Sequence, residues 1–299
     1  MKTRVIQNVT QETGEPTPST ASPRHSRTSN LVQRRPLMSF FVLTYAVAWS
    51  LWTPLVVAGD RLPGALGLVL AMLGSLVPST LAILFIARLH GRRGVRKLLG
   101  RLLKARIGLR WYLAVLLLAM LVPLGVALSV VFGGPAPDVD ATIASALFLF
   151  VFMIFPGSAM GEELGWRGFA LPHLQRDHSA LGASLVIGAI WGCWHLPLYL
   201  VGTDVRSPSI FPAFVLSVIA LSVICTWLYN STGGSLLIVV LCHAAANLPL
   251  TLLLDPLGKQ SARPFLIYLA LFVIVTAAIV VATGPAHLSR TQPKQTDVP

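Results

Sequence analysis

The sequence predicts an all-α fold, a polytopic transmembrane helical bundle of about eight helices, and three observations lead to this prediction. Hydrophobic residues make up 55% of the 299 residues and charged residues only 11%, whereas soluble domains average about 25% charged residues. The mean hydropathy is +0.73. The apolar residues fall into long runs, each near the ~20 residues that cross a bilayer. Lipid is therefore expected to surround much of the protein, where helices satisfy their own backbone hydrogen bonds.

Eight apolar spans can be read from the sequence, and each is expected to be helical because an open strand edge in lipid leaves backbone groups unpaired. Together they predict one transmembrane domain at 37–284, without an internal repeat. Residues 1–36 are polar and rich in Ser, Thr, Pro and Arg, which predicts a disordered tail. A second, short tail is expected at 285–299. The predicted spans are 37–58, 66–87, 111–132, 143–171, 181–200, 210–229, 234–254 and 264–283.

Lys and Arg residues predict the orientation of the chain in the cell membrane. The N-terminal tail carries six of them and the loop predicted at 88–110 carries nine, whereas the loop predicted at 133–142 carries none. Positive residues collect on the cytosolic side of membrane spans, so the N-terminus is predicted to be cytosolic. An even number of spans returns the C-terminus to the same side. Because the basic residues flank apolar runs without interleaved aromatics, the net charge of +12 does not predict a nucleic-acid partner.

Three charged residues, Glu162, Glu163 and Arg167, lie inside a predicted span. A charge near the bilayer centre is costly and by default marks a functional site. Glu163 and Arg167 are spaced i, i+4, so they share a helix face and can pair, whereas Glu162 lies about 100° around the helix and can face a cavity. The alternative is a buried ion-pair network that ties helices together. That alternative is weaker for Glu162, because a second carboxylate adds cost without needing to add structure.

Two further spans bring a histidine each, and one of them also brings an asparagine. His243 and Asn247 are spaced i, i+4, and both can donate hydrogen bonds to a single oxygen, as an oxyanion hole requires; an interhelical polar contact is the alternative. His195 alone would be interpreted as a core or interfacial histidine. At about 1.5 Å per residue, Glu162 and His195 lie about 20 Å from the predicted cytosolic face and His243 about 14 Å, so the three can meet within the bilayer.

The residues form three short motifs. "EELGWR" at 162–167 reads as EExxxR, Trp191 and His195 form an aromatic-xxx-His block, and "HAAAN" at 243–247 reads as HxxxN. In this order on successive helices, across about 143–254, they resemble the family of CAAX prenyl endopeptidases and bacteriocin-processing proteins called CPBP or Abi. The second block of that family usually opens with Phe, whereas this chain has Trp191.

The resemblance implies an eight-helix, glutamate-dependent intramembrane endopeptidase that hydrolyses a peptide bond in a membrane-associated or lipidated peptide or protein. Its partners would be membrane lipid and that substrate. It also implies three functional pairs, one to activate a water, one to stabilise the oxyanion and one to support the others: Glu162 with His195, His243 with Asn247, and Glu163 with Arg167.

Two alternatives to a metal-free protease stay open. Members of this family are often labelled metalloproteases, and Glu162, His195 and His243 would supply three zinc ligands with an open fourth position. However, the sequence has no HExxH, and Cys193 and Cys242 do not converge with the neighbouring histidines on a helix. No cofactor is therefore expected, with zinc as the alternative. The other function class is a non-catalytic membrane immunity or scaffold protein of the same fold; a transporter is disfavoured because no repeat is seen.

Overall fold

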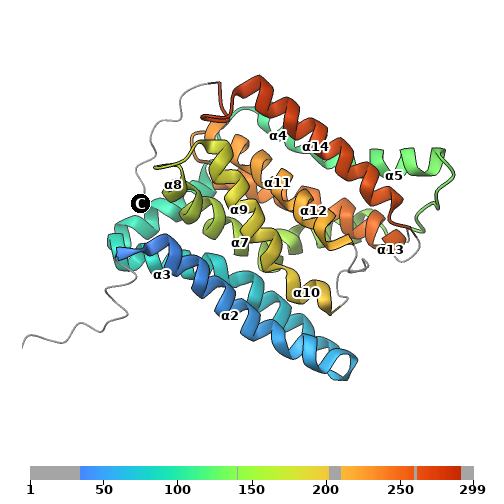
Figure 1. The fold of residues 1–299 in the computed structure, drawn as a ribbon, viewed down its shortest axis with the longest axis horizontal. Coiled ribbons are helices and arrows are strands. Elements are labelled where there is room, and N and C mark those ends of the chain that lie inside the picture. The colour runs from blue at the N-terminus through green and yellow to red at the C-terminus, as the bar shows by residue number, and fades with distance from the viewer. Residues whose placement is uncertain (1–33, 140, 202–209, 259–260, 291–299) are drawn as a thin grey trace, which may run out of the picture.

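The computed structural model describes residues 34–139, 141–201, 210–258 and 261–290, and these residues form helices and connecting segments without a strand (Figure 1). The predicted tail at 1–36 lies almost entirely outside the described residues. The elements are α2 (Pro36–Ala58), η1 (Gly59–Arg61), α3 (Gly64–Gly100), η2 (Arg101–Leu103), α4 (Leu109–Ala119), α5 (Leu121–Val131), α6 (Ile143–Phe152), η3 (Met153–Gly157), α7 (Ala159–Gly165), η4 (Trp166–Ala170), α8 (Leu171–Leu174), α9 (Ala180–Trp194), α10 (Leu196–Leu200), α11 (Phe211–Ser231), α12 (Leu236–Pro249), η6 (Leu250–Leu254), α13 (Asp255–Gly258) and α14 (Arg263–Thr283).

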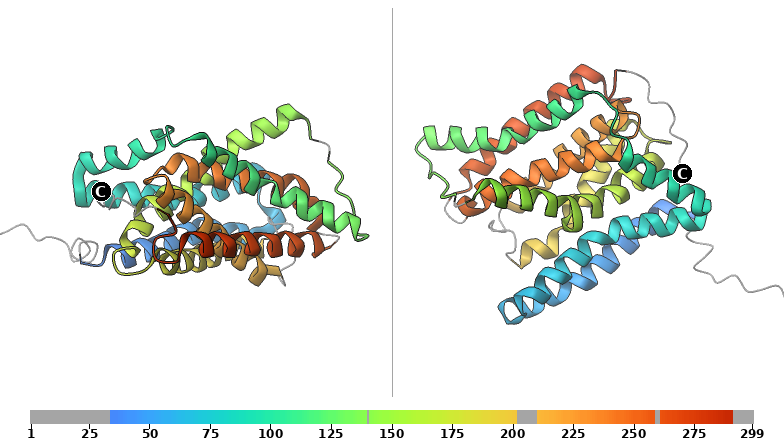
Figure 2. Two further views of the ribbon diagram at one scale, coloured as in Figure 1. Left: turned by 90° about the horizontal axis from the view of Figure 1, so that it is seen from above. Right: turned by 180° about the vertical axis from the view of Figure 1, so that it is seen from behind.

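Seven helical stretches of the described chain are long and apolar enough to cross a membrane, and a bent pair of helices makes up to eight. This confirms the predicted polytopic helical bundle. Within the apolar stretch of each helix, 56% of the residues are buried in α11 but only 22% in α14. Helix α11 is therefore central and α14 peripheral. Large apolar side chains such as Leu117 and Val281 stay exposed, as expected for a surface that faces lipid. Helices α2 and α3 form an antiparallel pair along one side of the bundle (Figures 1 and 2).

The span predicted at 143–171 is broken rather than continuous. Ile143–Gly157 and Ala159–Leu174 meet at an angle of 40°, and the segment η3 before the break contains Pro156 and a residue with non-helical backbone angles, Phe155 (φ −159°, ψ 131°). A proline inside a helix removes a backbone donor and clashes with the preceding turn, which explains the bend. Because of this bend, α7, which carries Glu162 and Glu163, enters the bundle in a different direction from α6.

The basic segment 88–110, predicted as a loop, is largely helical. Helix α3 continues to Gly100 through a kink at Gly91, where φ is 63° and ψ is −164°. A residue without a Cβ adopts this positive φ readily, so the chain can turn there and resume a helix. Beyond the kink, Leu98 is buried, whereas Arg92 and Arg96 are exposed. The prediction of a loop was wrong because the many charged residues lie on the exposed face of a short helix whose other face is apolar.

Two pairs of glycines bring the helices of the bundle core close together. Gly161 and Gly165 on α7 face α3 so closely that a Cβ at Gly161 would lie 2.8 Å from the backbone oxygen of Ser75. On α9, a Cβ at Gly188 would lie 2.6 Å from the Cα of Ile219 on α11, and Gly192 is similarly tight. Small residues spaced i, i+4 let membrane helices approach in this way. The two contacts fix the positions of α7 and α9 around a common centre.

The segment after α14 packs against the bundle. The carbonyl oxygens of Pro285 and Ala286 accept hydrogen bonds from the backbone N–H groups of Leu181 and Ala180, at 3.0 and 2.9 Å. Leu288 is fully buried. Part of the tail predicted at 285–299 therefore caps the start of α9, and residues 291–299 lie outside the described chain. The start of α2 and the end of α14 lie at the same end of the bundle (Figure 1).

Candidate functional site

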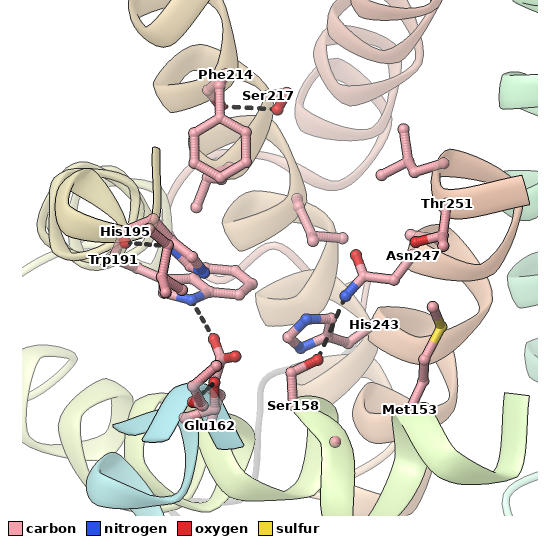
Figure 3. A pocket seen from close by; sticks show the side chains of 18 of the residues that line it. Met153, Ser158, Glu162, Trp191, His195, Phe214, Ser217, His243, Asn247 and Thr251 are labelled. Carbon is pink, nitrogen blue, oxygen red and sulfur yellow. Dashed lines mark hydrogen bonds between the residues drawn. The ribbon is translucent and has the colours of Figure 1, made fainter. Parts of the chain in front are cut away.

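A cavity of about 330 Å³ opens between α7, the end of α9, α11 and α12. The four side chains predicted as catalytic, Glu162, His195, His243 and Asn247, all line it (Figure 3). They come from three segments whose residues are up to 85 positions apart in sequence, and the bundle brings the three motifs to one cavity. The rest of the wall is mostly apolar and includes Leu149, Phe152, Leu198, Phe214, Val218 and Leu250.

Glu163 does not face this cavity but forms the centre of a buried charged cluster. Its carboxylate accepts two hydrogen bonds from Nη1 of Arg167, at 2.8 Å each, and both side chains are fully buried. Oxygen Oε1 of Glu163 also lies 2.9 Å from Nδ1 of His243. The predicted i, i+4 pair is therefore present. The contact with His243 was not predicted, and it orients the imidazole so that Nε2 is the nitrogen available to the cavity.

Glu162 is 1% exposed and takes a different direction from Glu163. Its Oε2 accepts a hydrogen bond from the indole N–H of Trp191, which lies on α9 (Figure 3). The sequence identified Trp191 only as the aromatic residue that opens the second motif. The hydrogen bond went unrecognised because a Trp next to a Gly in an apolar span has no pattern that distinguishes a donor from a packed ring.

His195 stands where α9 ends. Pro197, two residues later, lacks a backbone N–H, and its ring clashes with the carbonyl of the residue four positions earlier, so a regular helix cannot continue. Nδ1 of His195 lies 2.9 Å from the carbonyl oxygen of Trp191. A carbonyl can only accept, so Nδ1 carries the proton, and in the neutral ring Nε2 is left as an acceptor.

Asn247 is half-buried on the wall that α12 contributes. Its amide nitrogen lies 3.5 Å from Oγ of Ser158, the residue at the break before α7. Ser158 also lines the cavity and was not predicted as a site residue. A serine in an apolar span is too common to signal a site, and its place beside Asn247 follows from the bend at Pro156.

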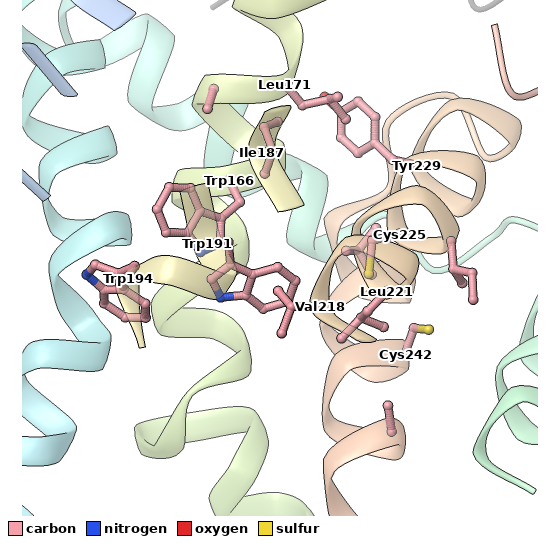
Figure 4. Close-up of a cluster of buried hydrophobic side chains, with 14 of the residues drawn as sticks. Trp166, Leu171, Ile187, Trp191, Trp194, Val218, Leu221, Cys225, Tyr229 and Cys242 are labelled. Carbon is pink, nitrogen blue, oxygen red and sulfur yellow. The ribbon is translucent and has the colours of Figure 1, made fainter. Parts of the chain in front are cut away.

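The fit of a metal to this site can be tested on its donor groups. Within the described part of the chain, no three His, Cys, Asp or Glu side chains converge closely enough to hold a metal ion. Cys242 and Cys225 are buried (Figure 4) and Cys193 is exposed, and none of the three lines the cavity. The residues as arranged do not fit a zinc site, so no step is assigned to a metal.

The fold and the site together define a multi-pass helical membrane protein with a polar cavity among its spans. A family model described as type II CAAX prenyl endopeptidase Rce1-like matches residues 143–249, a stretch that contains all three motifs. The chain is also 27% identical over 221 residues to CAAX prenyl protease 2 of Methanococcus maripaludis, a match that covers 70% of this chain and 82% of that protein. The chain is therefore similar to the CPBP family of intramembrane endopeptidases, which the motifs also indicated.

Proposed function

We propose that this protein hydrolyses a peptide bond in a membrane-associated or lipidated peptide or protein, with Glu162 and His195 activating the water. The observation that carries the proposal is the convergence of Glu162, His195, His243 and Asn247 on one cavity inside a helical bundle. Burial of charge at membrane depth is costly and is retained where it serves function. The name of the archaeal relative supports a prenylated substrate, and the apolar walls of the cavity suit an apolar side chain next to the scissile bond.

The chemistry is general-base hydrolysis. A water between Glu162 and His195 gives its proton to one of them as its oxygen attacks the carbonyl carbon, and the same proton later reaches the leaving amine. The oxyanion formed in the attack accepts hydrogen bonds from His243 and Asn247. Nδ1 of His243 donates to the Glu163 carboxylate. For Nε2 to donate to the oxyanion at the same time, the ring must carry a proton on both nitrogens, as an imidazolium does.

The test of the proposal is direct. The purified full chain, reconstituted in liposomes, is incubated with a membrane-anchored reporter peptide, with and without a prenyl group, and the products are identified by mass spectrometry. One new N-terminus at a defined peptide bond is expected. Failure to cleave either peptide, or any peptide isolated from cells that carry the protein, would favour the immunity or scaffold alternative.

We expect catalysis to need no bound metal. The lack of converging donor groups in the described residues supports this expectation. Elemental analysis of active protein should find no stoichiometric metal, and activity should survive chelation that silences a zinc protease assayed in parallel. Zinc at one per chain, with activity lost on removal and restored on its return, would instead make Glu162, His195 and His243 ligands.

We propose that both termini are cytosolic, because Lys and Arg are concentrated in the N-terminal tail and in segment 88–110. A reporter enzyme that is active only in the cytosol should be active when it is fused after Asn30 and when it is fused after Arg290. A reporter inserted in segment 133–142, which carries no Lys or Arg, is the matched control and should show the opposite behaviour. A terminal fusion that reports the outer side would overturn the proposed orientation.

A further inference from the structure

One residue, Trp191, contacts four of the charged or titratable members of the candidate site. Its indole N–H donates to Oε2 of Glu162. The guanidinium carbon of Arg167 lies 4.6 Å from the centre of its ring, and the His243 ring meets it edge-on at 5.1 Å. Its backbone carbonyl accepts the hydrogen bond from His195. Trp191 is 1% exposed and lines the cavity.

The hydrogen bond matters because a glutamate side chain has three rotatable bonds and must be held to act on a single water. Among the described residues, Trp191 is the side chain that donates a hydrogen bond to the Glu162 carboxylate. It engages one oxygen, so the second oxygen stays available to the cavity. The rigid indole is itself fixed by the stacked guanidinium of Arg167. The donor is therefore preorganised, and it restricts the carboxylate to one orientation.

Arg167 is a competing partner for the Glu162 carboxylate in this chain. Nε and Nη2 of Arg167 are buried and have no hydrogen-bond partner within the described structure, because Glu163 engages Nη1 alone. A free carboxylate would be attracted to these groups, since charge-assisted hydrogen bonds are the strong ones. Glu162 and Arg167 contact the same indole at different places, one at the N–H edge and one on the face. The ring keeps the two charges apart.

We propose that Trp191 is a positioning residue: its indole N–H holds Glu162 toward the cavity and away from Arg167, so that the free carboxylate oxygen can take a proton from water. This inference rests on the proposed function.

The test is Trp191→Phe in the full chain in liposomes. Phe keeps an aromatic ring for packing but removes the donor. We expect kcat to fall about 10- to 100-fold, the range that follows from misplacing a reacting group by about 1 Å. KM should change less than about twofold, because the substrate contacts of the cavity wall remain.

Trp194→Phe is the matched control. Trp194 is fully buried on the same helix, its ring also contacts His195, and its indole N–H has no hydrogen-bond partner in the described structure. It does not line the cavity. The control loses the same volume but no hydrogen bond, so its Tm should fall about as much as that of Trp191→Phe while kcat stays near the parental value.

A second variant decides the question if Trp191→Phe does not fold. Benzothienylalanine at position 191 keeps the size of the indole and replaces its N–H with sulfur, so it should lower kcat as Phe does. Parental kcat in either variant would overturn the positioning role, and an equal loss of kcat in Trp194→Phe would reduce it to packing. With either of these two results, the parental protein would still cleave the peptide and would still need Glu162 to do so. The positioning role would then fail while the proposed function stands.

Discussion

Glu162→Gln is expected to lower the rate of peptide hydrolysis by about 10²–10⁴-fold, the usual contribution of a general base. Glutamine keeps the shape of glutamate, and its amide oxygen can still accept the hydrogen bond from Trp191. It cannot take a proton from water at neutral pH. Because no ion pair to Glu162 is present among the described residues, the substitution removes a buried charge without leaving a partner unpaired, and stability should hold or improve.

The measurement is cleavage of the reporter peptide in liposomes together with the Tm of each variant. Asp177→Asn is the matched control, because it makes the same carboxylate-to-amide change at an exposed residue outside the cavity. It should leave the rate unchanged. Cleavage by Glu162→Gln at the parental rate would show that Glu162 is not the base, and the polar cluster would then be better explained as a structural network.

Much of the fold could be predicted because the bilayer limits the choices. Once lipid is the solvent, apolar length alone defines the spans, and seven of the eight predicted spans correspond to helical stretches that are long and apolar enough to cross a membrane. The exceptions have local causes. Pro156 breaks the fourth span. Gly91, with its positive φ, makes the kink after which the basic segment continues as a helix. In both places backbone geometry, which hydropathy does not report, decides the course of the chain.

The candidate site was predictable where spacing along one helix defines a contact, and less so elsewhere. The pairing of Glu163 with Arg167 follows from i, i+4 spacing within a helix. The bond from Trp191 to Glu162 and the contact of Glu163 with His243 join different helices. They depend on how closely α7 and α9 approach their neighbours, which the glycine contacts set. The catalytic roles of the residues stay predictions.

Arg167→Ala is expected to damage both folding and activity. Arg167 is fully buried and pairs with a fully buried Glu163, so its removal leaves a carboxylate with only His243 to compensate it. Breaking a buried ion pair from one side typically costs roughly 3–5 kcal/mol. Activity should fall as well, because Glu163 orients His243 and Arg167 stacks on Trp191. Yield of folded protein, Tm and cleavage rate are the measurements, with Arg176→Ala, at an exposed position, as the control.

The double variant Arg167→Met with Glu163→Gln separates the two effects. Removing both charges leaves neither side chain unpaired, so much of the stability lost in Arg167→Ala should return. Catalysis should stay impaired, because the imidazolium of His243 then lacks the carboxylate that balances its charge and fixes its ring. If the double variant regained the parental rate along with its stability, the Glu163–Arg167 pair would serve folding alone, and the orientation of His243 would have to come from its own packing against Trp191.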